Sequence, residues 1–336
     1  MPTIKDIAAK LGVSSGTVSK GLNGAEDISE SLREKILATA VEMGYTKKSL
    51  HKPDTRKLCI FIENMDYYLE DDFGYDIILG FKHAAYKENW DVEVIPVSEE
   101  FQSKRPYDSF MMGRSISGSL NLGFAVDDPW MTEFKTTSVP TILFDNFIRE
   151  NPMVGSVGTD DEEGIGLAIE HLTNLGHRKI ALLNGPETAM VSQSRLKAYE
   201  SNMKKHDLAY SHRFIAHEPY SQDAARKHIK QFYDIGITAI ICGNDTLALG
   251  VIKECERLGI SVPGEMSVIG YDDISACDKS IPPLTSVRQD RVQLGKCCYY
   301  ILYALVNGVS LSRNLLRPSL TMRNSTAEVN SHPIIS

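Results

Sequence analysis

Residues 1–24 read MPTIKDIAAKLGVSSGTVSKGLNG and contain the pattern of two short helices joined by a tight turn. Apolar residues recur at spacings of three and four, which places them on one face of a first helix. They are Ile4, Ile7, Ala8 and Leu11. Gly12 is expected to end this helix, and Ser14 is a favourable N-cap for a second. The second helix carries small polar side chains around Val18, so it is too polar to belong to a core.

A third helix is expected directly after this pair. Asn23-Gly24 predicts a turn, Ser29 a helix start and Gly44 a helix end. Three helices within residues 1–44 can form a small bundle that presents the second helix outward. Hydroxyl groups and a lysine on such a helix suit the base edges and phosphates of a DNA major groove. The alternative is a pair of surface helices capped by serines.

Several runs of the chain resemble LacI/GalR transcriptional regulators. Their N-terminal DNA-binding domain is similar to TIKDIAAKLGVSSGTVSKGLNG and ISESLREKILATAVEMGY. Their effector-binding body is similar to GIGLAIEHLTNLGHRKIALLNGP, ICGNDTLALGVIKECERLGISVPGEMSVIGYDD and PPLTSVRQDRVQLGK. The resemblance implies a sequence-specific DNA-binding regulator, most often a repressor. It implies a homodimer that binds a double-stranded DNA operator under the control of a small effector.

The charge is distributed unevenly along the chain. Residues 1–57 contain ten Lys and Arg against seven Asp and Glu, a net charge of +3; because the whole chain carries −8, the remainder carries −11. An acidic body restricts phosphate contacts to the N-terminal part. A length of 336 residues with 42% hydrophobic residues predicts two or three compact units.

Cysteine usage and hydropathy indicate a cytoplasmic protein without a metal or cofactor. The cysteines form no CxxC pair and no spacing with histidine that would hold zinc, so we expect reduced thiols. They are Cys59, Cys242, Cys255, Cys277, Cys297 and Cys298. No apolar run approaches the ~20 residues of a membrane helix, and the N-terminus does not resemble a signal peptide.

Residues 46–57, TKKSLHKPDTRK, are polar and basic and predict a linker. It would join a helix-turn-helix domain, residues 1–45, to an effector-binding and dimerisation domain, residues 58–336. LacI/GalR proteins carry here a proline-asparagine pair and an alanine-arginine-leucine helix that inserts leucines into the minor groove. This chain departs from that pattern, so Leu50 is the one candidate for insertion. The alternative is a solvated tether whose lysines contact phosphates.

Apolar runs alternate with helical patterns along the body, as is typical of parallel α/β sheets. The expected strands are 58–62, 92–95, 141–144, 179–183, 239–242 and 266–270, and a helix is expected over 75–88. The resemblance implies two Rossmann-like subdomains of the periplasmic-binding-protein-like type. One would comprise about 58–160 and 290–321, and the other 161–289 and 322–336. A ligand would lie between these lobes, at the carboxyl ends of the strands.

The resemblance places DNA contacts on the second helix. The residues expected to hold phosphates and set the register are Thr17, Ser19 and Asn23. Those expected to face base edges are Ser15, Gly16 and Lys20. Thr3 and Ser14 complete the set of expected DNA-binding residues. Because Gly16 has no side chain, base recognition by this helix would depend mainly on Ser15 and Lys20.

The resemblance also assigns effector-binding positions. They are Phe73, Tyr75, Asp160, Val191, Arg195, Tyr220, Asn244 and Asp272. Arg195 can direct two donors at vicinal hydroxyls or at a carboxylate, and Asp272 can accept from ligand hydroxyls. This combination with aromatic residues favours a sugar or sugar derivative. Purines, which the family also binds, are the alternative.

Some of these residues have a structural explanation instead. Asp160 and Asp245 are each predicted to cap the helix that follows. Arg195 and Asp272 can form an ion pair with each other. Tyr220 can stack on a sugar ring as a lid, or pack on the sheet as a loop residue.

Two other functional classes were weighed against a regulator. GIGLAIEHL lacks the third glycine of a dinucleotide-binding loop, and the sequence GxxxxGK[ST] does not occur. Ser192 and Ser194 lack the GxSxG context of a nucleophile. A solute-binding protein would share the two-lobed body, but the N-terminal helices and the absence of an export signal argue against it. We therefore expect neither an enzyme nor a transport protein.

Overall fold

The computed structural model describes residues 2–25, 27–45, 56–70 and 72–329. Leu50 and most of the predicted linker lie outside the described residues. The chain divides into two compact units. The first comprises Met1–Met65, Ile78–Val157 and Gly295–Asn314, and the second comprises Asp66–Ile77, Gly158–Leu294 and Leu315–Ser336. The domain boundaries expected from the sequence remain predictions.

Three helices open the chain, α1 (Ile4–Leu11), α2 (Ser15–Asn23) and α3 (Glu30–Glu42). Thr3 begins α1 with a capping box, in which its hydroxyl accepts from the Asp6 amide and the Asp6 carboxylate accepts from the Thr3 amide. Gly12 ends α1 in the left-handed conformation, with φ of 67°. The buried core that the helices share includes Ile7, Val18, Leu22 and Ile36. The predicted helix-turn-helix is confirmed.

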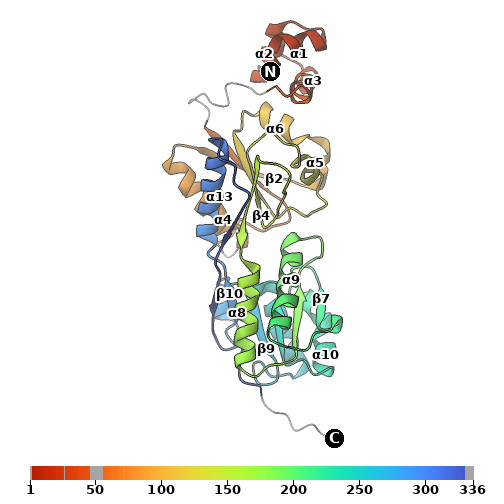
Figure 1. The fold of residues 1–336 in the computed structure, drawn as a ribbon, viewed down its shortest axis with the longest axis vertical. Coiled ribbons are helices and arrows are strands. Elements are labelled where there is room, and N and C mark those ends of the chain that lie inside the picture. The colour runs from red at the N-terminus through yellow and green to blue at the C-terminus, as the bar shows by residue number, and fades with distance from the viewer. Residues whose placement is uncertain (1, 26, 46–55, 71, 330–336) are drawn as a thin grey trace. The chain divides into compact units, whose positions relative to one another are not determined.

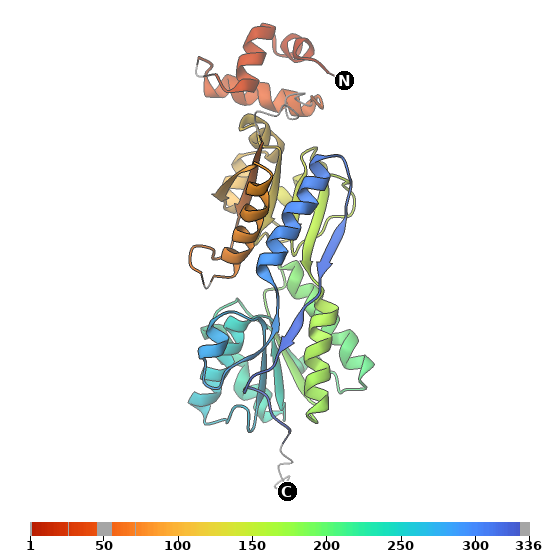
Figure 2. The same cartoon turned by 90° about the vertical axis from the view of Figure 1, so that its left-hand side faces the viewer.

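The first sheet has six strands in the order β11-β5-β4-β3-β1-β2. The strands are β1 (Lys57–Ile62), β2 (Asp91–Pro96), β3 (Gly118–Leu122), β4 (Thr141–Phe144), β5 (Val154–Thr159) and β11 (Arg313–Leu316). The helices around it are α4 (Phe73–Lys87), α5 (Glu99–Lys104), α6 (Tyr107–Gly113), α7 (Pro129–Glu133) and α13 (Arg291–Val306). Figures 1 and 2 show α4 and α13 side by side on this sheet, where the rings of Phe81 and Tyr299 are 5.8 Å apart.

The second sheet repeats this plan in the order β12-β10-β9-β8-β6-β7. Its strands are β6 (Ile180–Asn184), β7 (Ile215–His217), β8 (Ala239–Cys242), β9 (Ser267–Asp272), β10 (Thr285–Arg288) and β12 (Ser319–Thr321). Its helices are α8 (Asp161–Asn174), α9 (Met190–Lys205), η2 (His212–Phe214), η3 (Asp223–Ala225), α10 (Arg226–Asp234), α11 (Asp245–Leu258) and α12 (Ala276–Lys279). β12 is antiparallel to β10, whereas β7, β6, β8, β9 and β10 run parallel.

The α/β class expected from the sequence is confirmed. The six expected strands correspond to β1, β2, β4, β6, β8 and β9, with ends that differ by at most two residues. β6, β8 and β9 are buried along their whole length, which explains why they are continuous apolar runs rather than alternating patterns. Helix α4 begins at Phe73, two residues before the expected start, so Phe73 belongs to the helix and not to the preceding loop.

The six cysteines are free thiols, of which Cys297 is half-buried and the others are buried. Burial raises the pKa of Cys255 to about 12, so this thiol stays protonated and unreactive near neutral pH. Within the described residues, no helix is both long and apolar enough to cross a membrane.

Candidate functional site

Helix α2 presents its N-terminal turn to solvent. The Ser14 hydroxyl caps the helix by accepting from the Thr17 amide at 3.0 Å, and Val18 holds the opposite face in the core. The eight expected DNA-binding residues within the described part of the chain are exposed or half-buried: Thr3, Ser14, Ser15, Gly16, Thr17, Ser19, Lys20 and Asn23. Their accessibility is compatible with the expected DNA contacts, which remain a prediction.

Lys20 has a partner that the sequence did not indicate. Its ammonium group pairs with the carboxylate of Asp27, and this contact lowers the pKa of Asp27. Both side chains are more than half exposed, at 56% and 59%. Exposed ion pairs of this kind are weak and screened by salt, so Lys20 can exchange Asp27 for a group on DNA.

The second candidate site lies at the carboxyl edge of the second sheet. β6, β8, β9 and β10 run parallel, so the residues that follow them meet at one edge. Those residues include Gly185, Gly243, Asn244 and Gln289, and Asp272 ends β9. Expected ligand residues from distant parts of the sequence therefore gather there.

Arg195 reaches this edge from α9 and is almost fully buried. Its Nε donates to Oδ1 of Asp161 at 3.1 Å, and its Nη1 donates to the carbonyl of Gly243. Although burial alone would lower the pKa of Arg195, the Asp161 carboxylate raises it. The alternative considered for Arg195, an ion pair with Asp272, is not present, because Asp161 is the carboxylate that Arg195 contacts. Two of the five N–H groups of Arg195 are therefore used within the protein, and the other three belong to Nη1 and Nη2.

Asp272 is buried at the end of β9, with 8% of its surface exposed. Its Oδ1 accepts from Nε2 of Gln289 at 2.7 Å. Burial raises the pKa of Asp272 to about 6, against the opposing effects of Arg195 and of Gln289. At neutral pH the side chain is thus mainly a carboxylate held in a poorly solvated position.

Phe73 lies near Arg291, which follows β10. The guanidinium carbon of Arg291 is 5.9 Å from the centre of the Phe73 ring, and its Nε and Nη2 donate to Oδ2 of Asp76 at 3.1 and 2.9 Å. Its Nη1 is 3.4 Å from the carbonyl oxygen of Asp272. Tyr75 is half-buried in the first turn of α4. The first turn of α4 is therefore tied to Arg291 through Asp76, a residue that the sequence did not single out.

Tyr220 packs against the backbone of Gly185. A Cβ atom at Gly185 would lie 2.1 Å from the Tyr220 ring, so glycine is needed for the ring to approach. The Tyr220 hydroxyl is 3.0 Å from that of Ser192, the residue after Val191. Tyr220 also packs against the core cluster that includes Leu183 of β6, which fits the alternative of a loop residue packed on the sheet.

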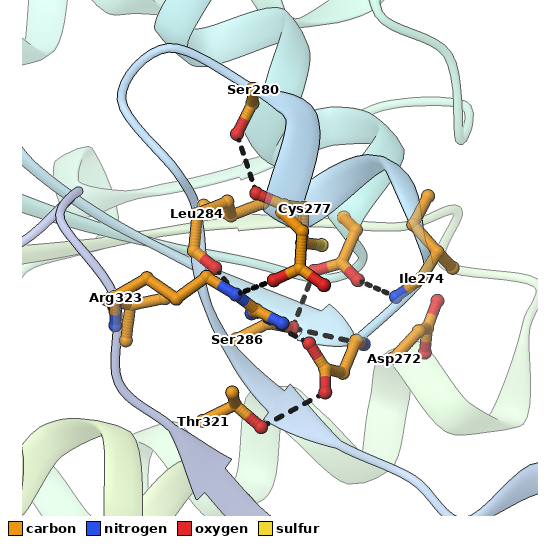
Figure 3. A network of polar contacts seen from close by, with 12 residues as sticks. Asp272, Ile274, Cys277, Ser280, Leu284, Ser286, Thr321 and Arg323 are labelled. Carbon is orange, nitrogen blue, oxygen red and sulfur yellow. Dashed lines mark hydrogen bonds and ion pairs between the residues drawn. The ribbon is translucent and has the colours of Figure 1, made fainter.

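Of the two predicted helix caps, the structure contains one and not the other. Asp160 does cap α8, since its Oδ1 accepts from the Glu163 amide at 3.1 Å. Asp245 does not cap α11; the cap is Asn244, whose Oδ1 accepts from the Leu247 amide at 2.9 Å. The prediction for Asp245 is therefore wrong. This carboxylate is fully buried and accepts from the amide of Ile274, a residue that follows β9 and is labelled in Figure 3.

The first sheet carries an acidic pair at its own carboxyl edge. Glu63 follows β1, is 5% exposed and accepts from Nε2 of Gln102. Burial, and then the nearby Asp128, raises the pKa of Glu63 to about 8. Asp128 accepts from the Ala125 amide at 2.7 Å, and burial raises its pKa as well. The two carboxyl groups therefore tend to hold a proton near neutral pH.

Sequence reasoning missed several residues of the second edge. They are Asp76, Asp161, Tyr271, Ser286, Gln289 and Arg291. Most of them lie next to residues that the sequence analysis named, as Asp161 does beside Asp160. The motifs that contain the named residues were therefore the available signal for the missed ones. Within the described residues, no group of three or more His, Cys, Asp or Glu side chains could hold a metal ion.

Family models match both parts of the chain. One described as "Bacterial regulatory proteins, lacI family" matches residues 3–48, and one described as "Periplasmic binding protein-like domain" matches residues 169–326. The HTH-type transcriptional repressor CytR of Escherichia coli (strain K12) is 26% identical over 332 residues, which cover 96% of each chain. The HTH-type transcriptional repressor PurR of Photobacterium profundum is 26% identical over 339 residues, 98% of this chain and 100% of its own.

Solved structures extend the likeness to the fold. A lac repressor dimer bound to operator and the anti-inducer ONPF is 26% identical, with a TM-score of 0.69 over 97% of this chain and 99% of the repressor. The transcriptional regulator CelR in complex with cellobiose is 24% identical, with a TM-score of 0.72 over 97% of this chain and 100% of CelR. The same arrangement of elements thus spans nearly the full length of each.

Proposed function

Because the chain belongs to the LacI/GalR family of bacterial regulatory proteins, we propose that it is a DNA-binding transcriptional repressor controlled by an uncharged, hydroxyl-rich ligand such as a sugar. The ligand is held at the carboxyl edge of the second sheet. The protein acts as a homodimer, since one helix-turn-helix alone contacts too few phosphates for tight specific binding.

Helix α2 supplies the DNA contacts. Its N-terminal turn is exposed, and hydroxyl groups and Lys20 lie on that surface while Val18 anchors the helix from behind. A dimer brings two such helices to half-sites about one helical turn apart. The two curated relatives described above are named as repressors, which supports the same activity here.

One observation carries the ligand class: Arg195 keeps N–H donors, and Asp272 keeps acceptor positions, that no hydrogen bond within the described residues occupies. Within the part of the chain that the structure describes, Nη2 of Arg195 and Oδ2 of Asp272 are left without a hydrogen-bond partner. One is a donor and the other is an acceptor. A hydroxyl group both donates and accepts, so neighbouring hydroxyls of a sugar satisfy the two atoms together.

The charges around these atoms argue against an anionic ligand. Asp161 compensates Arg195, and Asp76 compensates Arg291, with nitrogen to oxygen distances of 3.1 and 2.9 Å. The carboxylate of Asp272 is then in excess and would repel a phosphate or a carboxylate. The lac repressor structures with ONPF and with ONPG, both 26% identical to this chain, provide related examples of ligand-bound regulators.

Thermal unfolding against matched pairs of compounds tests the proposal. Each pair contains a sugar and its phosphate, such as glucose and glucose 6-phosphate, and purine bases and nucleosides form a separate set. A ligand at a hundredfold excess over its Kd adds about 2.7 kcal/mol to the free energy of unfolding. We expect an uncharged sugar to raise the midpoint and to change the affinity for an operator selected from random DNA.

Other outcomes would revise the proposal in different ways. A shift with sugar phosphates alone would contradict the charge argument and leave the repressor assignment intact. A shift with purines alone would replace the ligand class. Failure to select any DNA sequence would contradict the repressor assignment itself.

A further inference from the structure

The chain makes an unusual turn directly after β9. Asp272 has φ of 112° and Asp273 has φ of 57°, so two consecutive residues other than glycine adopt positive φ. The value for Asp272 lies outside the small left-handed region that such residues normally occupy. Backbone conformations of this kind persist only where surrounding contacts hold them. Residues 272–274 are called the Asp272 turn below.

One buried carboxylate holds both amides of the turn that follow Asp272. Oδ2 of Asp245 accepts from the Ile274 amide at 2.9 Å. Oδ1 of Asp245 accepts from the Ser286 hydroxyl at 2.6 Å, and the Ser286 oxygen accepts from the Asp273 amide at 3.1 Å. Asp245 thus holds the turn once directly and once through Ser286. Figure 3 shows Ile274 and Ser286, the residues through which it does so.

The neighbouring strand is built to admit this carboxylate. A Cβ atom at Gly270 would lie 2.0 Å from Oδ1 of Asp245. A distance that short cannot be relieved by a small shift, so β9 needs glycine at this position for Asp245 to enter. Asp245 is fully buried, and this burial, and then the charge of Asp272, raises its pKa to about 7.

A second group holds the turn through the side chain of Asp273. Nη1 of Arg323 is 2.7 Å from Oδ1 of Asp273, and the Thr321 hydroxyl donates to Oδ2 at 3.0 Å. Arg323 is itself anchored, since Nη1 donates to the carbonyl of Leu284 at 2.8 Å and its side chain is 13% exposed. Figure 3 shows Thr321 and Arg323 meeting the turn from the segment of β12.

We propose that Asp245, through Ser286 and together with Arg323, is a positioning residue that sets the direction of the Asp272 carboxylate toward the ligand. This inference rests on the proposed role of Asp272 as a ligand contact. With both following amides and the Asp273 carboxylate held, Asp272 projects to the other side, where it meets Gln289 at 2.7 Å. We assign none of the holding groups a ligand contact, because their contacts are with the turn and its neighbours.

Substitutions of Ser286 separate the effect of its two hydrogen bonds, to Asp245 and to the Asp273 amide, from the effect of its packing. Ser286→Ala removes the acceptor of the Asp273 amide, whereas Ser286→Thr keeps the hydroxyl and adds a methyl group. The matched control is Ser280→Ala, because the Ser280 hydroxyl donates to the carbonyls of Cys277 and Pro282 and not to the turn. Arg323→Met is a second, independent variant if Ser286→Ala folds poorly.

Two readouts on the full chain need no ligand. The first is amide hydrogen exchange at Asp273 and Ile274, resolved by fragmentation in a mass spectrometer. The second is the titration of the Asp272 carboxyl by ¹³C NMR, with the signal assigned by its loss in Asp272→Asn. If Ser286 only contributed to packing, Ser286→Ala would alter the midpoint of global unfolding but would not selectively shift the titration of Asp272.

We expect Ser286→Ala to speed exchange at Asp273 about five- to tenfold, the effect of one lost hydrogen bond. The Asp272 titration should move from near pH 6 toward the ordinary aspartate value of about 3.9 as the side chain gains water. Ser286→Thr and Ser280→Ala should preserve both readouts, and Arg323→Met should change both. Unchanged readouts in Ser286→Ala and Arg323→Met, or a larger effect of Ser286→Thr than of Ser286→Ala, would overturn the inference. Failure of the ligand class would appear in the thermal panel and not in these measurements.

Discussion

The guanidinium carbon of Arg195 lies 3.8 Å from the centre of the Tyr271 ring. The Tyr271 hydroxyl donates to Oδ1 of Asp161 at 3.1 Å, the same oxygen that accepts from Nε of Arg195. The guanidinium of Arg195, the phenol of Tyr271 and the carboxylate of Asp161 therefore contact one another at the carboxyl edge of the second sheet. This arrangement aims Arg195 while leaving only part of its hydrogen-bonding capacity for a ligand.

Asp161→Asn should destabilise the protein strongly. Arg195 and Asp161 are both more than 90% buried, and removing one partner of a buried pair costs about 3–5 kcal/mol because the other charge stays uncompensated. Urea unfolding at pH 7 measures the loss. The control is Asp223→Asn, since Asp223 pairs with Arg226 on the surface and should contribute almost nothing. Equal midpoints for Asp161→Asn and the parent would contradict the proposed group.

Lys20→Ala should weaken operator binding by about 1–3 kcal/mol, the usual value of a base contact from a side chain. Fluorescence titration with the selected operator measures the affinity. Asp27→Ala serves as the opposite change, because it removes the carboxylate that Lys20 contacts in this structure. We expect Asp27→Ala to bind at least as tightly as the parent. Equal affinity of Lys20→Ala and the parent would remove Lys20 from the interface.

Glu63→Gln should flatten the dependence of stability on pH. The pKa of Glu63 is raised from 4.5 to about 8 in the folded state, so the folded state binds the proton more tightly than the unfolded state does. The resulting stabilisation is fully present below pH 4.5 and is lost as the pH rises through about 8. The free energy of unfolding should therefore fall over this range in the parent, and fall less in Glu63→Gln.

Urea unfolding at a series of pH values from 5 to about 9 measures this difference, because the range brackets the loss of the shared proton. Asp245 and Asp272 also have raised pKa values, so part of the decline should remain in the variant. Glu100→Gln is the control, since Glu100 is exposed beside Lys104. An identical slope in Glu63→Gln and in the parent would show that Glu63 does not hold the proton.

Gly270→Ala should cost about 1–3 kcal/mol through overpacking, because the added Cβ would meet Asp245 at 2.0 Å. In the Asp245→Ala background the carboxylate is gone, so the same substitution should cost much less. A double-mutant cycle by chemical denaturation measures the coupling between the two positions. Additive effects would mean that the close approach of Asp245 to β9 does not occur in solution.

Asp272→Ala should abolish the thermal response to the best sugar of the panel and leave operator affinity without ligand nearly unchanged. The physical reason is that Oδ2 accepts no hydrogen bond within the described residues, whereas the DNA contacts are predicted in the N-terminal helices. Parallel ligand and DNA titrations measure the two effects. Asp223→Asn, on an exposed residue that pairs with Arg226 at the surface, should retain both functions. A retained response in Asp272→Ala would reassign the ligand contact.

Local patterns predicted much of this protein. The spacing of Ile7 and its neighbours, the cap at Ser14 and the stop at Gly12 placed the first two helices correctly, because these signals act within one turn of a helix. Continuous apolar runs also predicted six strands correctly. Strands that are buried on both faces of a sheet need no alternation of apolar and polar residues, so a local run of apolar residues is enough to mark them.

The partners of the polar residues required the tertiary structure. The sequence alone named Arg195 and Asp272 and offered a pair between them as the structural alternative to ligand contact, whereas Asp161 and Gln289 are their partners. It also assigned the cap of α11 to Asp245 instead of Asn244. Neighbouring residues such as these are chemically alike, and only backbone geometry decides which one faces solvent and which one faces the core.

By itself, the sequence determined the helix-turn-helix, the α/β class and the motifs from which the proposed ligand residues come. Only the tertiary structure decided which hydrogen-bonding atoms remain open at Arg195 and Asp272, and how Asp245 enters beside Gly270. The physical reason is the separation in sequence between the residues that interact. Helices and strands follow from interactions between residues near in sequence, whereas the charge balance of a site is set by side chains that parallel strands bring together from distant segments.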